Sequence, residues 1–191
     1  MALYKDQSPL PGKDLLPVPM PEPDQVLTTE RLLLRRFTLN DTGFIIRLLN
    51  SPGWIQFIGD RQVRTTGEAE HYLLNGPLKS YATLGYGLSL VAIKETLQPI
   101  GICGLLKRDG LDDVDIGFAF LPEAQGQGYA WEMVHAVIQH ARQQWQVGRV
   151  LAIVLPANTR SIHLLRKAGF VFDRKIQFTT SGEELLLFKK E

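Results

Sequence analysis

The stretch "VDIGFAFLPEAQGQGYAWEMV", residues 114–134, combines a strand pattern, a glycine turn and the start of a helix. Residues 114–120 alternate strictly between the two faces of an extended strand. One face carries large apolar side chains, whereas the other carries Asp115, Gly117 and Ala119. After the turn, apolar residues recur at helical spacing from Ala130 to Ala141. The order of strand, turn and helix predicts a strand–helix unit of an α/β domain.

Other predicted strands lie on both sides of this unit. Each is an apolar or alternating run bounded by turn residues, and they cover 31–37, 87–93, 100–106, 149–155, 170–172 and 184–189. The last two are expected to pair as a hairpin across Ser181 and Gly182.

Helices are predicted between several of these strands. Asn40 is the expected N-cap of a helix that ends before Pro52, and Thr65 with Glu68 has the spacing of a capping box. A short helix is predicted within 158–170, with Asn158 as its N-cap. The element order predicts an α/β (α+β) fold, with a mixed and mostly antiparallel central sheet of six to seven strands flanked by about four helices.

Composition narrows the class of protein. The chain has 191 residues, 45% of them hydrophobic, and a net charge of +1, which indicates a globular domain without the field expected of a nucleic-acid binder. A single cysteine, Cys103, excludes an internal disulfide and fits a reducing compartment. No signal peptide, membrane span or metal-ligand spacing is found in the sequence. We therefore expect a cytoplasmic protein, monomeric or homodimeric, without a metal and without nucleic-acid or membrane partners.

Residues 1–25 differ in composition from the rest of the chain. They contain six of the eleven prolines, and such a stretch favours extended or polyproline II geometry. We predict a proline-rich N-terminal arm over 1–25 and a single domain over 26–191. A ligand for a proline-recognition module is an alternative interpretation of the arm.

The glycine turn fits neither of two well-known phosphate-binding motifs. A P-loop requires glycine followed by lysine and then serine or threonine, and no glycine here meets that requirement. A dinucleotide fingerprint starts acceptably at Gly126 and Gly128 but meets Trp131 where a small residue is required. The remaining feature is a helix N-terminus with free backbone amides, which favours an anion such as a pyrophosphate. A plain strand-to-helix turn is the alternative.

Several motifs resemble the GNAT superfamily of N-acetyltransferases. "QGQGYA" (125–130) resembles the family's Q/R-x-x-G-x-G/A signature, with Pro122 three residues before it. "TTERLLLRRF" (28–37), "DIGFAFLPEAQGQGYA" (115–130) and "NTRSIHLLRKAGF" (158–170) resemble segments of the RimJ/RimL-like branch, which acetylates ribosomal-protein N-termini. The similarity runs from about residue 27 to 188 and implies a GNAT fold.

The resemblance implies a site for coenzyme A. In the family, amides of the turn hold the pyrophosphate, and the pantetheine arm lies between the strands that correspond here to 114–120 and 149–155. Carried over, these roles imply a set of cofactor-binding residues: Phe118, Ala119, Phe120, Gln125, Gly126, Gln127, Gly128, Tyr129, Ala130 and Asn158. Gly117 and Ala119 would leave room beside the arm, although packing against a helix also explains small residues on that face.

The implied reaction is attack of a neutral amine on the acetyl thioester. Asp115 is the best candidate for the base, on an open strand face where many family members carry a carboxylate, although a solvent-exposed structural aspartate is an alternative. Many members have a tyrosine acid where this chain has Leu165. Ser161 is the substitute donor to the leaving thiolate, and local backbone bonding is the alternative for this serine. Four aromatic residues lie in segments that cover the acceptor pocket in similar proteins: Trp54, Phe57, Tyr81 and Tyr86. They are expected either to line that pocket or to fill the core.

Three functional hypotheses follow from these residues. The first is an acetyl-CoA-dependent N-acetyltransferase acting on a primary amine, with a protein N-terminus as a candidate acceptor. The second is acetylation of a small-molecule amine. The third is a non-catalytic sensor that binds acyl-CoA. The absent tyrosine favours the sensor, whereas Asp115 and Ser161 favour an enzyme.

Overall fold

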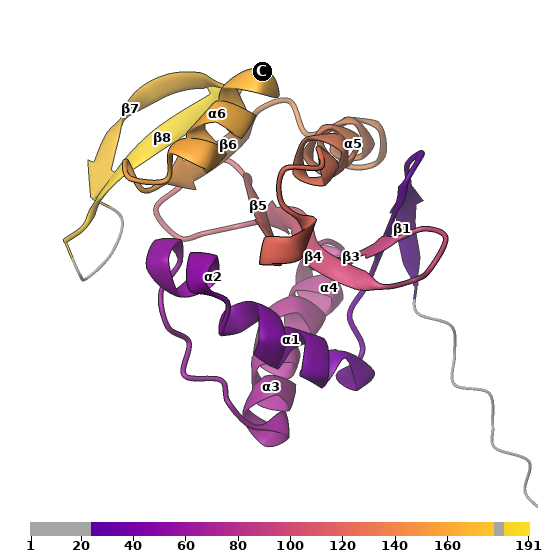
Figure 1. Cartoon of the computed structure of the whole chain (residues 1–191). Helices are drawn as coiled ribbons and strands as arrows, with labels where there is room; N and C mark the ends of the chain where they lie inside the picture. Colours follow the sequence, from indigo (N-terminus) through magenta and orange to yellow (C-terminus); the bar gives the residue numbers. More distant parts are fainter. Residues whose placement is uncertain (1–23, 178–181) are drawn as a thin grey trace, which may run out of the picture.

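A single eight-stranded sheet forms the centre of the molecule (Figure 1). The computed structural model describes residues 24–177 and 182–191. The strand order is β1-β2-β3-β4-β5-β6-β8-β7, and only the β5–β6 pair is parallel. The strands are β1 (Gln25–Thr28), β2 (Leu32–Arg35), β3 (Leu88–Ile93), β4 (Pro99–Leu106), β5 (Asp115–Phe120), β6 (Val150–Val154), β7 (Val171–Gln177) and β8 (Glu184–Lys190). The mixed, mostly antiparallel sheet is confirmed, with one strand more than predicted because β1 precedes the expected first strand.

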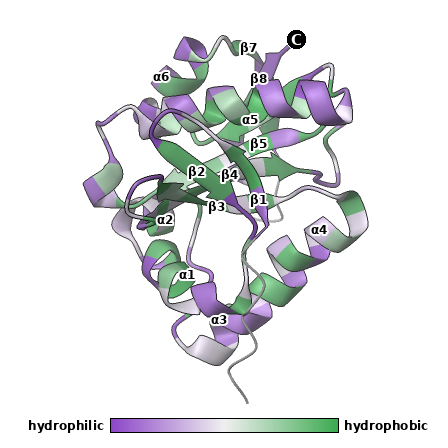
Figure 2. Cartoon of the chain, turned by 90° about the vertical axis from the view of Figure 1, so that its right-hand side faces the viewer, coloured by the Kyte–Doolittle hydropathy of each residue, from purple (hydrophilic) through white to green (hydrophobic). Residues whose placement is uncertain are grey.

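Helices cover both faces of this sheet (Figure 2). One layer holds α5 (Tyr129–Trp145) and α6 (Thr159–Lys167), and the other holds α1 (Thr42–Leu49), α2 (Pro52–Phe57), α3 (Thr66–Leu73) and α4 (Lys79–Leu84). Two cores follow from this arrangement. Met133 and Val137 of α5 pack against β2, β4 and β5, whereas Leu48 and Leu73 of α1 and α3 pack on the opposite face.

Three shorter helical segments are present among the described residues. They are 3-10 helices at Leu39–Asp41 and Pro122–Ala124 and a π-helix at Leu74–Leu78. The capping box of Thr65 and Glu68 at the start of α3 is confirmed, as is the Asn158 cap of α6.

One local prediction about the first helices was wrong. Thr38, rather than Asn40, caps the first helical segment, because its hydroxyl accepts from the Asn40 amide while its own amide donates to Asp41. The first helix, α1, ends before Pro52 as predicted. Pro52 also begins α2, a helix that was not predicted, since proline has no amide to lose at the first position of a helix.

Part of the expected arm, residues 1–23, and the hairpin-turn residue Ser181 lie outside the described residues. Within the described part, no helix is long and apolar enough to cross a membrane. The same residues contain no group of three or more histidine, cysteine or acidic side chains that could hold a metal ion.

Candidate functional site

The two sides of β5 are paired very differently. On one side β5 pairs with β4 along its whole length, from Leu106 opposite Asp115 to Gly101 opposite Phe120. On the other side it pairs with β6 at one position only, Asp115 opposite Leu151. The two parallel strands therefore separate toward their carboxyl ends, and this separation leaves polar backbone along β5 without a strand partner.

Alternation along β5 decides which backbone groups face the separation. The Leu121 amide donates to the Ile100 carbonyl of β4 at 2.9 Å. Every second residue from there, including Ala119, therefore directs its polar groups to β4, whereas Phe118 and Phe120 direct theirs toward β6. The Phe120 carbonyl already accepts from the Gln125 side chain at 3.3 Å. Of the three backbone positions predicted to meet a bound arm, Phe118 is thus the most accessible, and the Ala119 backbone is engaged elsewhere.

The glycine turn follows directly after β5. Gly126 and Gly128 both have left-handed backbone conformations, with φ of 76° and 81°. Residues with a side chain rarely adopt this conformation. The first hydrogen bond of α5 runs from the Glu132 amide to the Gly128 carbonyl at 3.1 Å. The amides of Tyr129, Ala130 and Trp131 therefore have no acceptor within the helix. A 17-residue helix adds its positive end to these amides, so the turn is suited to an anion.

A side-chain bridge joins the turn to α6. Gln125 donates to β5, as described above, and accepts from the Arg160 guanidinium at 2.8 Å. Arg160 therefore places a positive charge beside the turn, a feature that the sequence reasoning missed. In the same turn of α6, the Asn158 side chain accepts from the Ser161 amide at 3.1 Å. The Ser161 hydroxyl is half-buried and makes no hydrogen bond to any of the residues that the structure describes.

Asp115 lies at the opposite end of β5, where this strand meets β6. Its side chain is only 1% exposed, so the expectation of an open strand face was wrong. Both carboxylate oxygens accept from the Arg108 Nε at 3.0 Å. Burial raises the pKa of Asp115, while the charge and hydrogen bonds of Arg108 act in the opposite direction. The result is a buried carboxylate whose charged partner, among the residues that the structure describes, is Arg108.

Packing explains the small residue beside Asp115. A Cβ atom on Gly117 would lie 2.9 Å from a Leu106 methyl group and 3.1 Å from a Leu88 methyl group. Ala119 likewise packs against the core beneath α1 and α3. Side chains of neighbouring strands and the helical core therefore occupy this face, in agreement with the packing interpretation and not with free space for a ligand.

Comparison with known proteins identifies the family of this chain. Residues 31–171 match the family described as the acetyltransferase (GNAT) domain. The chain belongs to this family. As a GNAT protein it is an acetyltransferase, and the predicted fold is the fold of the family.

Individual relatives of this GNAT chain are distant. The Bacillus subtilis protein YkkB is 27% identical over 157 residues, which cover 79% of this chain and 88% of YkkB. Among solved structures, RimL, a ribosomal alpha-N-protein acetyltransferase in complex with coenzyme A, has a TM-score of 0.74 at 15% identity, covering 87% of this chain and 97% of RimL. A chimera of the spermidine N-acetyltransferase SpeG from Vibrio cholerae has a TM-score of 0.68 at 18% identity, covering 83% and 93%. At these identities the two structures show the fold alone.

Residues between β1 and β2, far from the glycine turn in the sequence, hold this turn in the GNAT domain. Arg31 donates to the Gln127 carbonyl at 3.0 Å and to the Glu132 carboxylate at 2.7 Å, and its guanidinium lies 4.6 Å from the centre of the Tyr129 ring. Thr29 donates to the same carboxylate at 2.6 Å. Burial alone would raise the pKa of Glu132, but the hydrogen bonds from Thr29 and Arg31 outweigh it and leave this pKa lowered. The β1–β2 hairpin thus fixes the first turn of α5.

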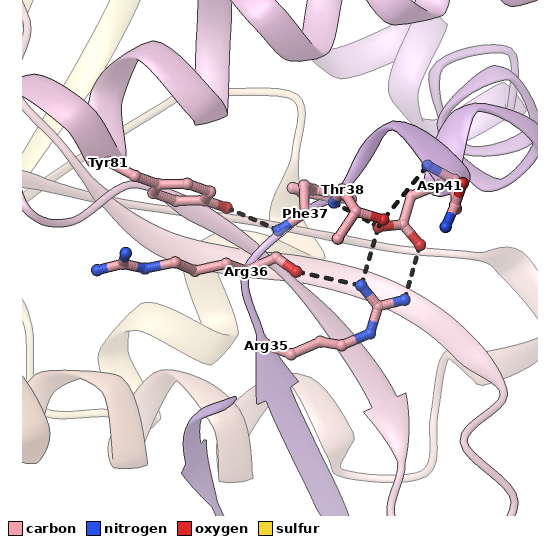
Figure 3. Close-up of polar contacts among 7 residues, drawn as sticks. Arg35, Arg36, Phe37, Thr38, Asp41 and Tyr81 are labelled. Carbon is pink, nitrogen blue, oxygen red and sulfur yellow. Dashed lines mark hydrogen bonds and ion pairs between the residues drawn. The ribbon is translucent and has the colours of Figure 1, made fainter. Parts of the chain in front are cut away.

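Other predicted site residues have structural positions. Leu165 is 1% exposed and packs in the core of the GNAT domain, so the structure offers no acid at the position of the family's tyrosine. Trp54 is likewise a core residue. Tyr81 connects strands: it accepts from the Phe37 amide and donates to the Leu88 carbonyl, next to the paired Arg35 and Asp41 (Figure 3).

Proposed function

We propose that this GNAT protein transfers the acetyl group of acetyl-CoA to a primary amine, with a protein N-terminal α-amine as the acceptor. The observation that supports this most strongly is the turn at Gly126 and Gly128, where unpaired amides of a long helix lie at the open end of the β5–β6 separation. An anion grip and an unpaired strand edge at one place fit a ligand with a charged pyrophosphate and a slender polar arm.

The residues present are compatible with coenzyme A. Amides from Gly126 to Ala130 would hold the pyrophosphate, because the Gln125 amide already donates to the Pro122 carbonyl at 3.2 Å. Arg160 would add a positive charge next to it. The Phe118 backbone would bond to the pantetheine arm, which would pass Asn158 at the start of α6. Gly128 is suited to such close approach because it has no side chain.

Asp115 and Ser161 supply the proposed proton transfers. The amine nitrogen attacks the thioester carbonyl carbon, the carbon–sulfur bond breaks, and the amine proton passes to Asp115 through a water molecule. A raised carboxyl pKa makes Asp115 a stronger base than an ordinary aspartate. The charge and hydrogen bonds of Arg108 favour the carboxylate form, which accepts the proton. The Ser161 hydroxyl donates to the thiolate, which with a pKa of about 8.5 is already an acceptable leaving group.

An α-amine is the favoured acceptor on chemical grounds. Its pKa of about 7.7–8.0 leaves a useful neutral fraction at neutral pH, whereas a lysine amine at about 10.4 needs a more effective base. Asp115 is buried and shared with Arg108, which suits an acceptor that needs little deprotonation. RimL and the SpeG chimera share the fold and are named for a protein N-terminus and for spermidine, so a small-molecule amine is the second candidate.

Thiol release from acetyl-CoA over a panel of amines tests the proposal. The panel contains peptides with free and blocked N-termini, spermidine and free amino acids. We expect release with the free peptides and loss of release when their N-termini are blocked. Release with spermidine alone would favour the small-molecule candidate, and tight coenzyme A binding without release for any amine would favour the sensor.

A further inference from the structure

A cavity lies at the end of α5 that is far from the glycine turn. Its volume is about 390 Å³, and its lining comes from the start of β1, the end of β2, the segment before β3 and the last turns of α5. The 17-residue helix has a length of about 25 Å, so this cavity is separate from the proposed coenzyme A site. The proposed acetyl transfer leaves it without a role.

Aromatic rings and polar side chains share this cavity. The Tyr86 and Trp145 ring centres lie 5.2 Å apart, and the Arg36 guanidinium lies 5.1 Å from the centre of the Tyr81 ring. Figure 3 shows Arg36 and Tyr81 on neighbouring segments. Grooves lined by aromatic rings with nearby hydrogen-bond donors are the surfaces that bind proline-rich segments, because the flat rings pack against proline and the donors bond to its free carbonyl groups.

The chain itself contains such a segment, which ends one residue before Asp24 in the sequence. Asp24, which lines the cavity, is held by the Arg36 amide at 2.8 Å and by the Arg36 guanidinium at 3.5 Å. Immediately before it the sequence is "LLPVPMPEP", residues 15–23, with proline at every second position from Pro17. The segment also carries a negative charge at Glu22, two residues before Asp24 in the sequence. No residue separates this segment from Asp24, so the tether between the segment and the cavity is very short.

We propose that residues 15–23 bind in this cavity of their own chain, with prolines against Tyr86 and Trp145. A short tether raises the effective concentration of the segment to about the millimolar range, so weak intrinsic affinity is enough for occupancy. The N-terminal arm is then an intramolecular ligand that covers the aromatic surface at the β1 edge of the sheet.

Indole signals in a nuclear magnetic resonance spectrum of the full chain give the first test. The three tryptophans provide three indole N–H signals, and Trp145→Phe assigns the one in the cavity. Replacing Pro17, Pro19 and Pro21 by serine should shift the Trp145 signal and leave that of the buried Trp54 unchanged. Replacing Pro9 and Pro11 is the matched control and should shift neither. An unchanged Trp145 signal in the first variant would overturn the proposal.

Disulfide trapping gives a second and independent test. Met20→Cys is combined with Gln144→Cys at the cavity, or with Gln177→Cys on β7 at the opposite edge of the sheet as the control. The native Cys103 is buried and does not compete. Under oxidised glutathione we expect cross-linked monomer to form about tenfold faster with Gln144→Cys than with Gln177→Cys. Equal rates, or a cross-linked dimer in place of the monomer, would contradict binding within one chain.

Discussion

The two ends of β5 satisfy their polar groups in opposite ways. At the carboxyl end, the strand separates from β6, and the glycine turn leaves amides without partners. At the amino end, the strands meet, and Arg108 pairs with the buried carboxylate of Asp115. The open end is suited to receive a ligand without rearrangement, whereas the closed end must release or share a charge before Asp115 can act. Binding and chemistry are therefore expected to respond to different substitutions.

Asp115→Asn gives the largest expected effect and tests the closed end. If Asp115 removes the amine proton, kcat should fall by about 10²–10⁴-fold, while coenzyme A affinity stays unchanged. Because Asp115 must be deprotonated to act and its pKa is raised, wild-type kcat/KM should rise with pH through a value above that of an ordinary aspartate, about 3.9. The variant should lose this acid limb. A near-wild-type rate across pH 6–8 would exclude Asp115 as the base.

Arg108→Ala should destabilise the fold by about 2–4 kcal/mol, because it leaves a buried carboxylate without its partner. The sign of the pH dependence follows from Asp115. A carboxyl with a raised folded pKa contributes stability that is complete below its unfolded pKa and lost as pH rises through the folded one. The Arg108→Ala penalty should therefore be small near pH 4 and grow toward neutral pH in urea unfolding.

The double variant Arg108→Ala/Asp115→Asn is the control for that measurement. It removes the charge together with its partner, so it should recover most of the lost stability at neutral pH. A penalty that is equally large in the double variant would assign Arg108 a packing role and remove the electrostatic difference between the two ends of β5.

Gly128→Ala tests the open end. A side chain at φ of 81° costs about 1 kcal/mol, and the added Cβ would lie 3.4 Å from Arg31. We expect coenzyme A to bind about tenfold more weakly by calorimetry, because the turn must shift away from the pyrophosphate position. Gly148→Ala is the matched control, since a Cβ there meets no atom within 4 Å. Equal affinities in the two variants would separate the turn from cofactor binding.

Ser161→Ala should have a smaller effect on rate, below about tenfold in kcat, because the thiolate leaves acceptably without a proton donor. The Asn158 cap of α6 uses the Ser161 amide and is retained in the variant. The rate of thiol release by the variant, measured at several pH values, checks this expected effect on kcat. A loss as large as that of Asp115→Asn would make protonation of the leaving group, instead of deprotonation of the amine, the demanding step.

Arg160→Ala has the smallest expected effect, a weakening of coenzyme A binding of about threefold to fivefold that decreases as salt is raised. Arg166→Ala, on the same helix but in its last turn, is the control. Identical salt dependence in the two variants would show that Arg160 acts on Gln125 alone and not on the bound anion.

Much of the fold was accessible from local patterns. The strict alternation of 114–120 predicted β5, the apolar spacing after Gly128 predicted α5, and the capping box of Thr65 and Glu68 predicted the start of α3. These features depend on residues within one or two turns of each other, so they are visible in a linear sequence. The first helices were less accessible, because Pro52 suits both the end of one helix and the start of the next.

The sequence by itself therefore determined the turn at Gly126 and Gly128 and the order of strands and helices around it, because backbone preferences are local. Only the tertiary structure decided the surroundings of the site. Arg108 reaches Asp115 across 7 residues, Arg160 reaches Gln125 across 35, and Arg31 reaches Glu132 across 101. The burial of Asp115 was misjudged for the same reason. Whether a strand face is open depends on which side chains of other strands and helices cover it, and no periodicity records that.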